Sequence, residues 1–324
     1  MTSRLKGADL EALIAAVSDA SGIPQRILAK DYWATEVLRG MANDCDGTFL
    51  FKGGTSLSKG YHLLDRYSED IDLLVLADPS DAAAVGVVLD AIHASAVRTM
   101  GSPGAVVEKS RSDDGLCREI SVVFVTQTRN VPGVEKTIRL EPGVRGGPAP
   151  RERVEIRSLL AERAPDELRD RVEAYDDGRA FSIDVLHPAR TLVEKLLAVH
   201  GLAVALHTGT RDKVPSRFAR HFYDLHQLCL PGSAALTYLE RTGGFDSMLD
   251  DAIDVTNRWF TSGTPLVVPP GGLTQSPAFT DPALRLQLEA AYVATCAELC
   301  YPSAMRPTWD EMLRSVASAA PLLS

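Results

Sequence analysis

The chain has few cysteines, no long apolar run and no excess of positive charge, and each of these shortages excludes a class of protein. The five cysteines among 324 residues are scattered and odd in number, which argues against a disulfide framework. No apolar run approaches the length of a bilayer span. Acids at Asp9, Glu11 and Asp19 interrupt any signal-like core at the N-terminus. We therefore expect a cytoplasmic protein that does not associate with a membrane.

The formal net charge of −9 argues against a broad nucleic-acid-binding surface. One local exception is the segment "TRDKVPSRFARH", residues 210–221, which is net basic over a dozen residues. Its cations are Arg211, Lys213, Arg217 and Arg220. This segment is the candidate contact with a phosphate-rich molecule.

Hydrophobic patterning predicts a mixed α/β fold followed by helices. The first half of the chain alternates predicted helices (9–22, 24–44, 55–66 and 81–100) with short strands such as 48–51 and 70–77. After about residue 150 the patterns become mainly helical. We expect two domains, a small sheet flanked by helices over residues 1–150 and a mainly helical C-terminal domain over residues 151–324.

The stretch from Phe51 to Val75 combines a glycine pair with three acids at the start of an apolar strand. Residues two apart on a strand share a face, so Asp70 and Asp72 point the same way and repel each other unless a cation compensates. Carboxylate oxygens favour magnesium or manganese. The glycine turn allows close approach of a ligand, and amides at a helix start can hold phosphate. Together these features predict a site for a metal-bound nucleoside triphosphate.

Each feature has a plain structural alternative, namely an ordinary turn and a solvated strand end. A Walker-type phosphate loop is excluded, because Lys59 is not preceded by the glycine that this motif requires. The combination of the glycine pair with the acid pair is more specific than either part alone.

The motif "KGGTSLSK", followed by "RYSEDIDL", resembles the glycine-pair and acidic motif of the nucleotidyltransferase superfamily, and especially of its AbiEii/MenT toxin family. Further segments resemble the same family: "LAKDYWATEVL", "IRLEPGVRGGPAP", "PARTLVEKLLAV" and "RFARHFYDLHQL". The resemblance covers roughly residues 30–228. It implies the nucleotidyltransferase type of fold.

The resemblance also implies roles for residues of the first half of the chain. Asp70 and Asp72 would bind metal ions, Mg²⁺ or Mn²⁺. Glu141, which ends a predicted strand, would be the third carboxylate, and Glu155 in "RVEIRS" is its rival for that role. The triphosphate would be held by Gly53, Gly54, Thr55 and Ser56.

In the second half of the chain, the resemblance makes Lys195 a phosphate contact and Asp224 a functional acid. Without it, Lys195 would be interpreted as an ordinary exposed helix lysine. Asp224 lies among aromatic residues, where an unpaired charge is costly, so it should pair with Lys195 or Arg220.

The implied activity is metal-dependent transfer of a nucleotide from an NTP to RNA, with the 3′ end of tRNA as the expected acceptor. The implied biological role is that of a toxin with a separately encoded antitoxin. One alternative keeps the chemistry but uses a small molecule, such as an antibiotic, as the acceptor. Another is a non-catalytic nucleotide-binding module, and the intact acid pair argues against it.

Overall fold

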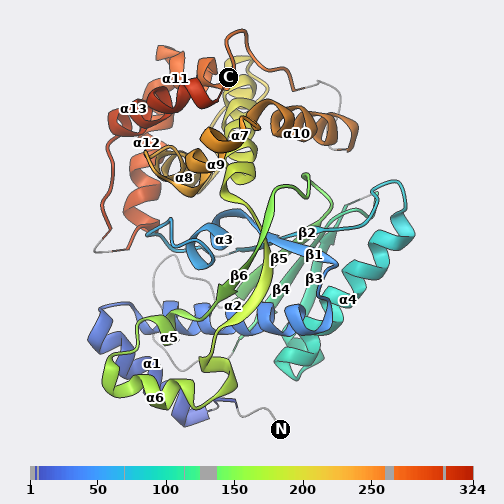
Figure 1. Cartoon of the computed structure of the whole chain (residues 1–324), viewed down its shortest axis with the longest axis vertical. Coiled ribbons are helices and arrows are strands. Elements are labelled where there is room, and N and C mark those ends of the chain that lie inside the picture. Colours follow the sequence, from blue (N-terminus) through green and yellow to red (C-terminus); the bar gives the residue numbers. More distant parts are fainter. Residues whose placement is uncertain are drawn as a thin grey trace. The chain divides into compact units, whose positions relative to one another are not determined.

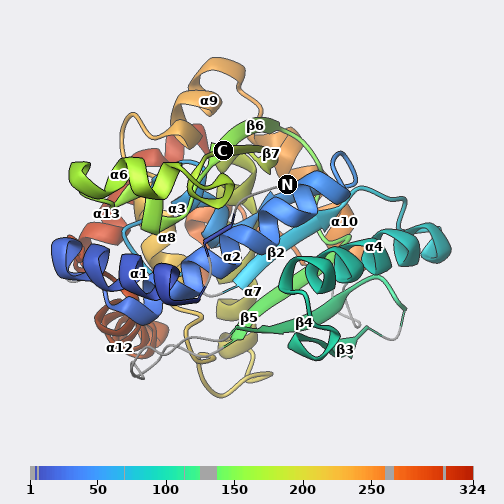
Figure 2. The ribbon, with the colours of Figure 1, turned by 90° about the horizontal axis from the view of Figure 1, so that it is seen from below.

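The computed structural model describes residues 4–5, 7–68, 70–112, 114–124, 137–259, 266–301 and 304–323. The contacts divide the chain into two compact units. Unit 1 comprises Met1–Gly60, Glu69–Val144 and Glu152–Val185. Unit 2 comprises Tyr61–Ser68, Arg145–Arg151 and Leu186–Ser324. Figure 1 labels most elements of both and Figure 2 labels β7, and each unit is described by itself.

Unit 1 is built on a mixed sheet with the strand order β3-β4-β5-β2-β1-β7-β6. The strands are β1 (Phe49–Lys52), β2 (Asp70–Val75), β3 (Val106–Arg111), β4 (Arg118–Val123), β5 (Thr137–Gly143), β6 (Arg151–Ile156) and β7 (Phe181–Leu186). β2 runs antiparallel to β1 and parallel to β5, so the acid-bearing strand lies inside the sheet.

Unit 1 also contains helices beside this sheet. They are α1 (Gly7–Ser21), α2 (Gln25–Asp44), α3 (Gly53–Lys59), α4 (Ala82–Met100), α5 (Leu159–Glu162) and α6 (Asp166–Glu173), with short 3₁₀ turns at Pro103–Ala105 and Asp176–Gly178. α2 and α4 pack on each other and both contact β5 (Figure 2). Ile71 and Leu73 of β2 are each 1 % exposed, so burial of these alternate residues commits the acids of β2 to the opposite face.

The predicted fold class, a small sheet flanked by helices and followed by helices, is confirmed. Two details differ from the sequence analysis. The helix after the glycine pair ends at Lys59 instead of continuing to residue 66. Residues 151–186, which were grouped with the helical half, contribute β6 and β7, and β7 pairs in parallel with β1. The strand-like run "RVEIRS" is thus an edge of the sheet.

Unit 2 is helical and is organised around α7, which contacts α8, α9, α10 and α11. Its helices are α7 (Pro188–His207), α8 (Arg220–Leu228), α9 (Ala234–Thr242), α10 (Phe245–Trp259), α11 (Pro277–Thr280), α12 (Pro282–Leu299) and α13 (Trp309–Ala319), with 3₁₀ turns at Leu273–Gln275 and Ala320–Leu322. That the chain folds as two domains divided near residue 150 stays a prediction.

One described helix, α4, has the length and composition of a membrane span. By position it is a helix of unit 1, because it contacts α2 and strands β2, β3, β4 and β5. The same length and composition occur in core helices of globular units.

A buried charge cluster joins α3, α2 and α5 within unit 1. The Nζ of Lys59 lies 2.6 Å from Oδ1 of Asp31, and Lys59 is 6 % exposed. Asp31 also accepts the backbone N–H of Leu159 at 2.6 Å. Burial, with a smaller contribution from Asp31, raises the pKa of the nearby Glu162 to about 7. Lys59 therefore ties the glycine-loop helix to α2.

Replacing Glu162 by Gln should remove a pH dependence of stability. Since the pKa of Glu162 is raised on folding from 4.5 to about 7, the folded protein binds this proton more tightly, and stability falls as pH rises through that range. Between pH 6 and 8 the free energy of unfolding of the wild type should fall by about 1 kcal/mol more than that of Glu162→Gln. Urea unfolding at both pH values measures this, and equal changes in the two proteins would contradict it.

Candidate active site

The acid pair of β2 lies beside the acid predicted on β5. In the parallel register, Asp70 pairs with Arg139 and Asp72 pairs with Glu141. Paired residues share a face, so all four side chains lie on the face opposite Ile71. Asp70 is only 7 % exposed, whereas Asp72 is half-buried and Glu141 is exposed. Three carboxylates are therefore grouped on two adjacent strands.

The glycine turn lies directly against this acidic face. β1 pairs with β2 so that Lys52 lies opposite Asp72, and Gly53 follows with a φ of 78°. A Cβ atom at Gly53 would lie 2.0 Å from Oδ2 of Asp72. Only glycine satisfies both the backbone angle and the close approach. The first glycine of the pair is thus required by its contact with Asp72.

The hydroxyl groups of α3 hold the turn in place. Thr55 Oγ1 donates a hydrogen bond to the backbone oxygen of Asp70, and Ser56 Oγ donates to the oxygen of Gly53 at 2.9 Å. Ser58 Oγ donates to the oxygen of Thr55 at 3.1 Å. These side chains therefore stabilise the backbone of the turn, and Thr55 fixes the start of α3 against the start of β2.

Arg139 supplies positive charge among the carboxylates. Its Nε lies 3.7 Å from Oδ1 of Asp70, and its Nη1 lies 3.5 Å from Oε1 of Glu141. Partial desolvation of its carboxyl by neighbouring protein atoms, together with the negative charges of Asp72 and Asp70, nevertheless raises the pKa of Glu141. With Lys52 opposite Asp72 on the same face, two cations, Arg139 and Lys52, lie among the three carboxylates.

The chemistry of these donors fits a divalent cation. Carboxylate oxygens are hard ligands of the kind that Mg²⁺ and Mn²⁺ prefer, and the repulsion that raises the pKa of Glu141 would be relieved by a cation. Within the described ranges, no three His, Cys, Asp or Glu side chains are placed closely enough to hold an ion together. Asp70 and Asp72 are thus the primary candidates, and Glu69 lies outside the described residues.

The two candidates for the third carboxylate lie at different places in the sheet. Glu141 is on β5, next to β2. Glu155 is on β6, which is separated from β2 by β1 and β7. At about 4.8 Å between strands, Glu155 is roughly 14 Å from the acid pair. The topology therefore favours Glu141.

Unit 2 contains a buried ion cluster around Asp224 of α8. The Nζ of Lys195, on α7, lies 2.6 Å from Oδ2 of Asp224, so the predicted pairing of these two residues is present. Arg66 makes a second ion pair with the same carboxylate, at 2.6 Å. Asp224 is 0 % exposed, Arg66 2 % and Lys195 5 %. Lys195 is not the exposed helix lysine that its sequence alone suggested.

Electrostatics in this cluster favours an ionised Asp224. Burial alone would raise the pKa of Asp224, but the charges of Arg66 and Lys195 hold it well below its usual value. Burial lowers the pKa of Lys195, and Asp224 opposes that effect. His221 Nδ1 lies 3.3 Å from Lys195 Nζ, and burial together with the charge of Lys195 keeps the pKa of His221 well below its usual value. His221 is therefore neutral near pH 7.

The basic segment, residues 210–221, leads into α8 and includes its first two residues. Arg211 and Lys213 are exposed. Arg217 adopts a φ of 61° and its Nη2 lies 2.6 Å from Oε1 of Glu298 on α12. Two of the four predicted cations are thus open to solvent, and one is drawn toward an acid.

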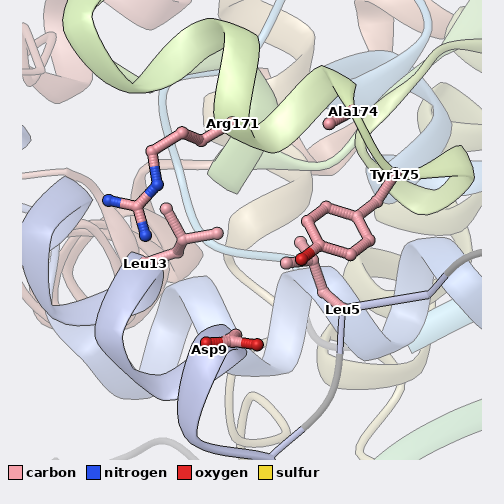
Figure 3. A pocket seen from close by; sticks show the side chains of 6 residues that line it. All are labelled: Leu5, Asp9, Leu13, Arg171, Ala174 and Tyr175. Atoms are coloured by element: carbon pink, nitrogen blue, oxygen red, sulfur yellow. The ribbon is translucent and has the colours of Figure 1, made fainter.

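A separate surface pocket of about 390 Å³ lies in unit 1 between α1 and α6 (Figure 3). Its lining is formed by Leu5, Asp9, Leu13, Arg171, Ala174 and Tyr175. None of the predicted site residues lines it.

Sequence reasoning assigned no role to Arg66 or Arg139. Arg66 begins the segment "RYSEDIDL", four residues before Asp70. Arg139 precedes Glu141 by two residues, and this spacing on a strand was a signal that it shares the face of Glu141.

A glycine turn packed against an acid pair on a mixed sheet is the arrangement expected of a nucleotidyltransferase. The sequence model of the family described as "Nucleotidyl transferase AbiEii toxin, Type IV TA system" matches residues 36–315. The chain therefore belongs to the AbiEii family of nucleotidyltransferase toxins. The match continues well past residue 228, where the motif resemblance ended.

A comparison with curated protein sequences finds no match. Among solved structures, the chain is similar to MenT4, a nucleotidyltransferase toxin from Mycobacterium tuberculosis H37Rv. The sequence identity is 19 %, the TM-score is 0.46, and the alignment covers 96 % of this chain and 98 % of MenT4.

Replacing Gly53 by Ala should abolish nucleotidyl transfer, because the new methyl group displaces the Asp72 carboxylate. Gly243→Ala is the matched control, since Gly243 has a φ of 60° and no atom within 4 Å of the added Cβ. Both variants should lose about 1 kcal/mol of stability from backbone strain. Transfer assays and thermal unfolding compare them, and full activity of Gly53→Ala would refute the close approach.

Proposed function

We propose that the protein transfers a nucleoside monophosphate from an NTP to RNA, at a tRNA 3′ end, and thereby blocks translation. Family membership establishes a nucleotidyltransferase toxin of a type IV toxin–antitoxin system, which has a separate antitoxin. Enzymes of this class use an NTP and a divalent metal. The observation that carries the proposal for the site is the contact between the Gly53 turn and the carboxylate of Asp72.

Asp70 and Asp72 would hold the divalent metal, Mg²⁺ or Mn²⁺, with Glu141 as the third carboxylate. When bound, such an ion supplies positive charge that stabilises the phosphates and lowers the pKa of a coordinated hydroxyl. The three carboxylates share one face and adjacent strands, which supports this assignment.

The glycine turn would bind the triphosphate through its backbone. The side-chain hydroxyls of Thr55 and Ser56 already bond to the backbone oxygens of Asp70 and Gly53. We therefore assign phosphate contacts to the backbone N–H groups of Gly54, Thr55 and Ser56, with the hydroxyls fixing the loop. The acceptor hydroxyl attacks the α-phosphorus and pyrophosphate leaves, so the loop contributes positioning and charge stabilisation.

Lys195 would contact the triphosphate, with Asp224 holding its amine. Lys195 is buried and ion-paired, so its position is defined, and a lysine ammonium is a common phosphate ligand.

An RNA acceptor is supported by the basic segment of unit 2, in which Arg211 and Lys213 are exposed. These cations would neutralise backbone phosphates and make binding salt-dependent. Membership in a toxin family favours this acceptor over an antibiotic.

Asp70→Asn and Asp72→Asn should each abolish label transfer while the protein stays folded, because each removes a charge that a metal ion requires. The assay incubates the protein with each labelled nucleoside triphosphate, Mg²⁺ and total RNA, and identifies the RNA species that gains label. Unchanged activity in both variants would refute the proposal that Asp70 and Asp72 bind the metal ion.

A matched pair of variants tests the third carboxylate in the same assay. Glu141→Gln should lower transfer by at least an order of magnitude, as loss of a charged site group does. Glu155→Gln, on the distant edge strand, should leave it unchanged. The opposite pattern would assign the role to Glu155.

Expression of the wild-type chain without an antitoxin should arrest growth, because nucleotides added to tRNA 3′ ends block aminoacylation. Expression of Asp72→Asn at the same level should not. Growth curves and the length of tRNA 3′ ends in the two cultures measure this. Equal growth of both cultures would count against a toxin, and drug resistance given only by the wild type would point to a small-molecule acceptor.

A further inference from the structure

The segment 61–68 joins α3 to β2 in sequence, but it belongs to unit 2. Arg66 forms an isolated antiparallel bridge with Cys300, at the end of α12. The N–H of Tyr67 donates to the oxygen of Leu299 at 2.8 Å. The backbone that carries Arg66 is therefore fixed by strand-like pairing on the end of a helix.

The guanidinium of Arg66 donates two parallel hydrogen bonds to the carboxylate of Asp224. Nε donates to Oδ1 at 2.6 Å and Nη2 donates to Oδ2 at 2.7 Å. The remaining nitrogen, Nη1, donates to the oxygen of Tyr67 at 3.0 Å and to Ser68 Oγ at 3.1 Å. A bidentate pair of this kind fixes the plane of a carboxylate as well as its distance.

The ammonium of Lys195 cannot form such a planar, bidentate pair with a carboxylate. Its ammonium is a compact charge on a flexible stem, and it lies 2.6 Å from Oδ2, one of the two oxygens that Arg66 holds. The shorter of the two contacts of this amine is the one to Asp224, and the second is to Nδ1 of His221 at 3.3 Å, so the orientation of the Asp224 carboxylate is a main determinant of where the amine lies.

The cluster also carries a surplus of positive charge. Arg66 and Lys195 contribute two cations against the single anion of Asp224, and all three side chains are buried. His221 beside Lys195 is neutral near pH 7, and Arg220 also raises the positive potential at Lys195. A buried surplus of this sign is stabilised by an anionic ligand such as a triphosphate.

We propose that Arg66 is a positioning residue for nucleotide binding. Its two parallel hydrogen bonds fix the carboxylate of Asp224, which in turn holds Lys195. Its charge also gives the cluster a net positive charge that can attract phosphate. This inference rests on the proposed contact of Lys195 with the triphosphate.

A double-mutant cycle in nucleotide affinity tests the inference. The four nucleoside triphosphates are titrated one at a time with Mg²⁺ into the wild type, Arg66→Lys, Lys195→Ala and the double variant, and the tightest is used for the cycle. Arg66→Lys keeps the positive charge but loses the pair of parallel hydrogen bonds to Asp224. It should raise Kd about tenfold in the wild-type background. In the Lys195→Ala background it should change Kd less than about twofold, because Arg66 acts through Lys195.

Arg190→Lys is the matched control. Arg190 is also buried in unit 2 and ion-paired, to Asp251 at 2.6 Å, with no bond to Asp224. It should leave Kd unchanged, and thermal unfolding compares its stability with that of Arg66→Lys.

Equal effects of Arg66→Lys in the two backgrounds, or no effect in the wild type, would overturn the inference. An unchanged Kd in Lys195→Ala would instead refute the proposed triphosphate contact, so the two failures are distinct. If Arg66→Lys unfolds, the cycle is run with Arg66→Gln, whose second readout is the pH dependence of Kd. Loss of the Arg66 charge should raise the pKa of Lys195 and move the alkaline loss of affinity to higher pH. An unshifted pH profile would overturn the inference.

Discussion

Repulsion among carboxylates on one face of the sheet is the constraint around which unit 1 is arranged. Asp70, Asp72 and Glu141 share that face because the alternate residues of β2 and β5 are needed in the core. Arg139 compensates part of the charge, and the pKa of Glu141 stays raised. The turn at Gly53 brings backbone against Asp72. Negative charge is therefore concentrated on this face of the sheet.

In unit 2 the grouped charges are mainly positive instead of negative. A buried carboxylate, Asp224, gathers two buried cations, and the net charge of the group is positive. Breaking such a cluster by removing one partner leaves an uncompensated buried charge, which typically costs about 3–5 kcal/mol. Unit 1 thus carries the acidic groups that suit a metal ion, and unit 2 carries the basic groups that suit phosphate.

Local patterns predicted the parts of the protein whose physics is local. The period-two spacing of Asp70 and Asp72 set their common face, and the glycine pair marked the turn. The pairing of Lys195 with Asp224 followed from the cost of an unpaired charge. Arg66 could not be found in this way, because its partner lies far along the chain and only tertiary packing joins them. The membership of β6 and β7 in the sheet likewise depends on long-range pairing.

The central claim is that the acidic face of β2 binds a divalent cation together with a nucleotide. Binding of Mn²⁺, followed by electron paramagnetic resonance in the presence of a nucleoside triphosphate, tests this most directly. The account predicts saturable binding to the wild type and its loss in the variant that carries Asp70→Asn and Asp72→Asn. Equal Mn²⁺ binding by the two proteins would contradict it.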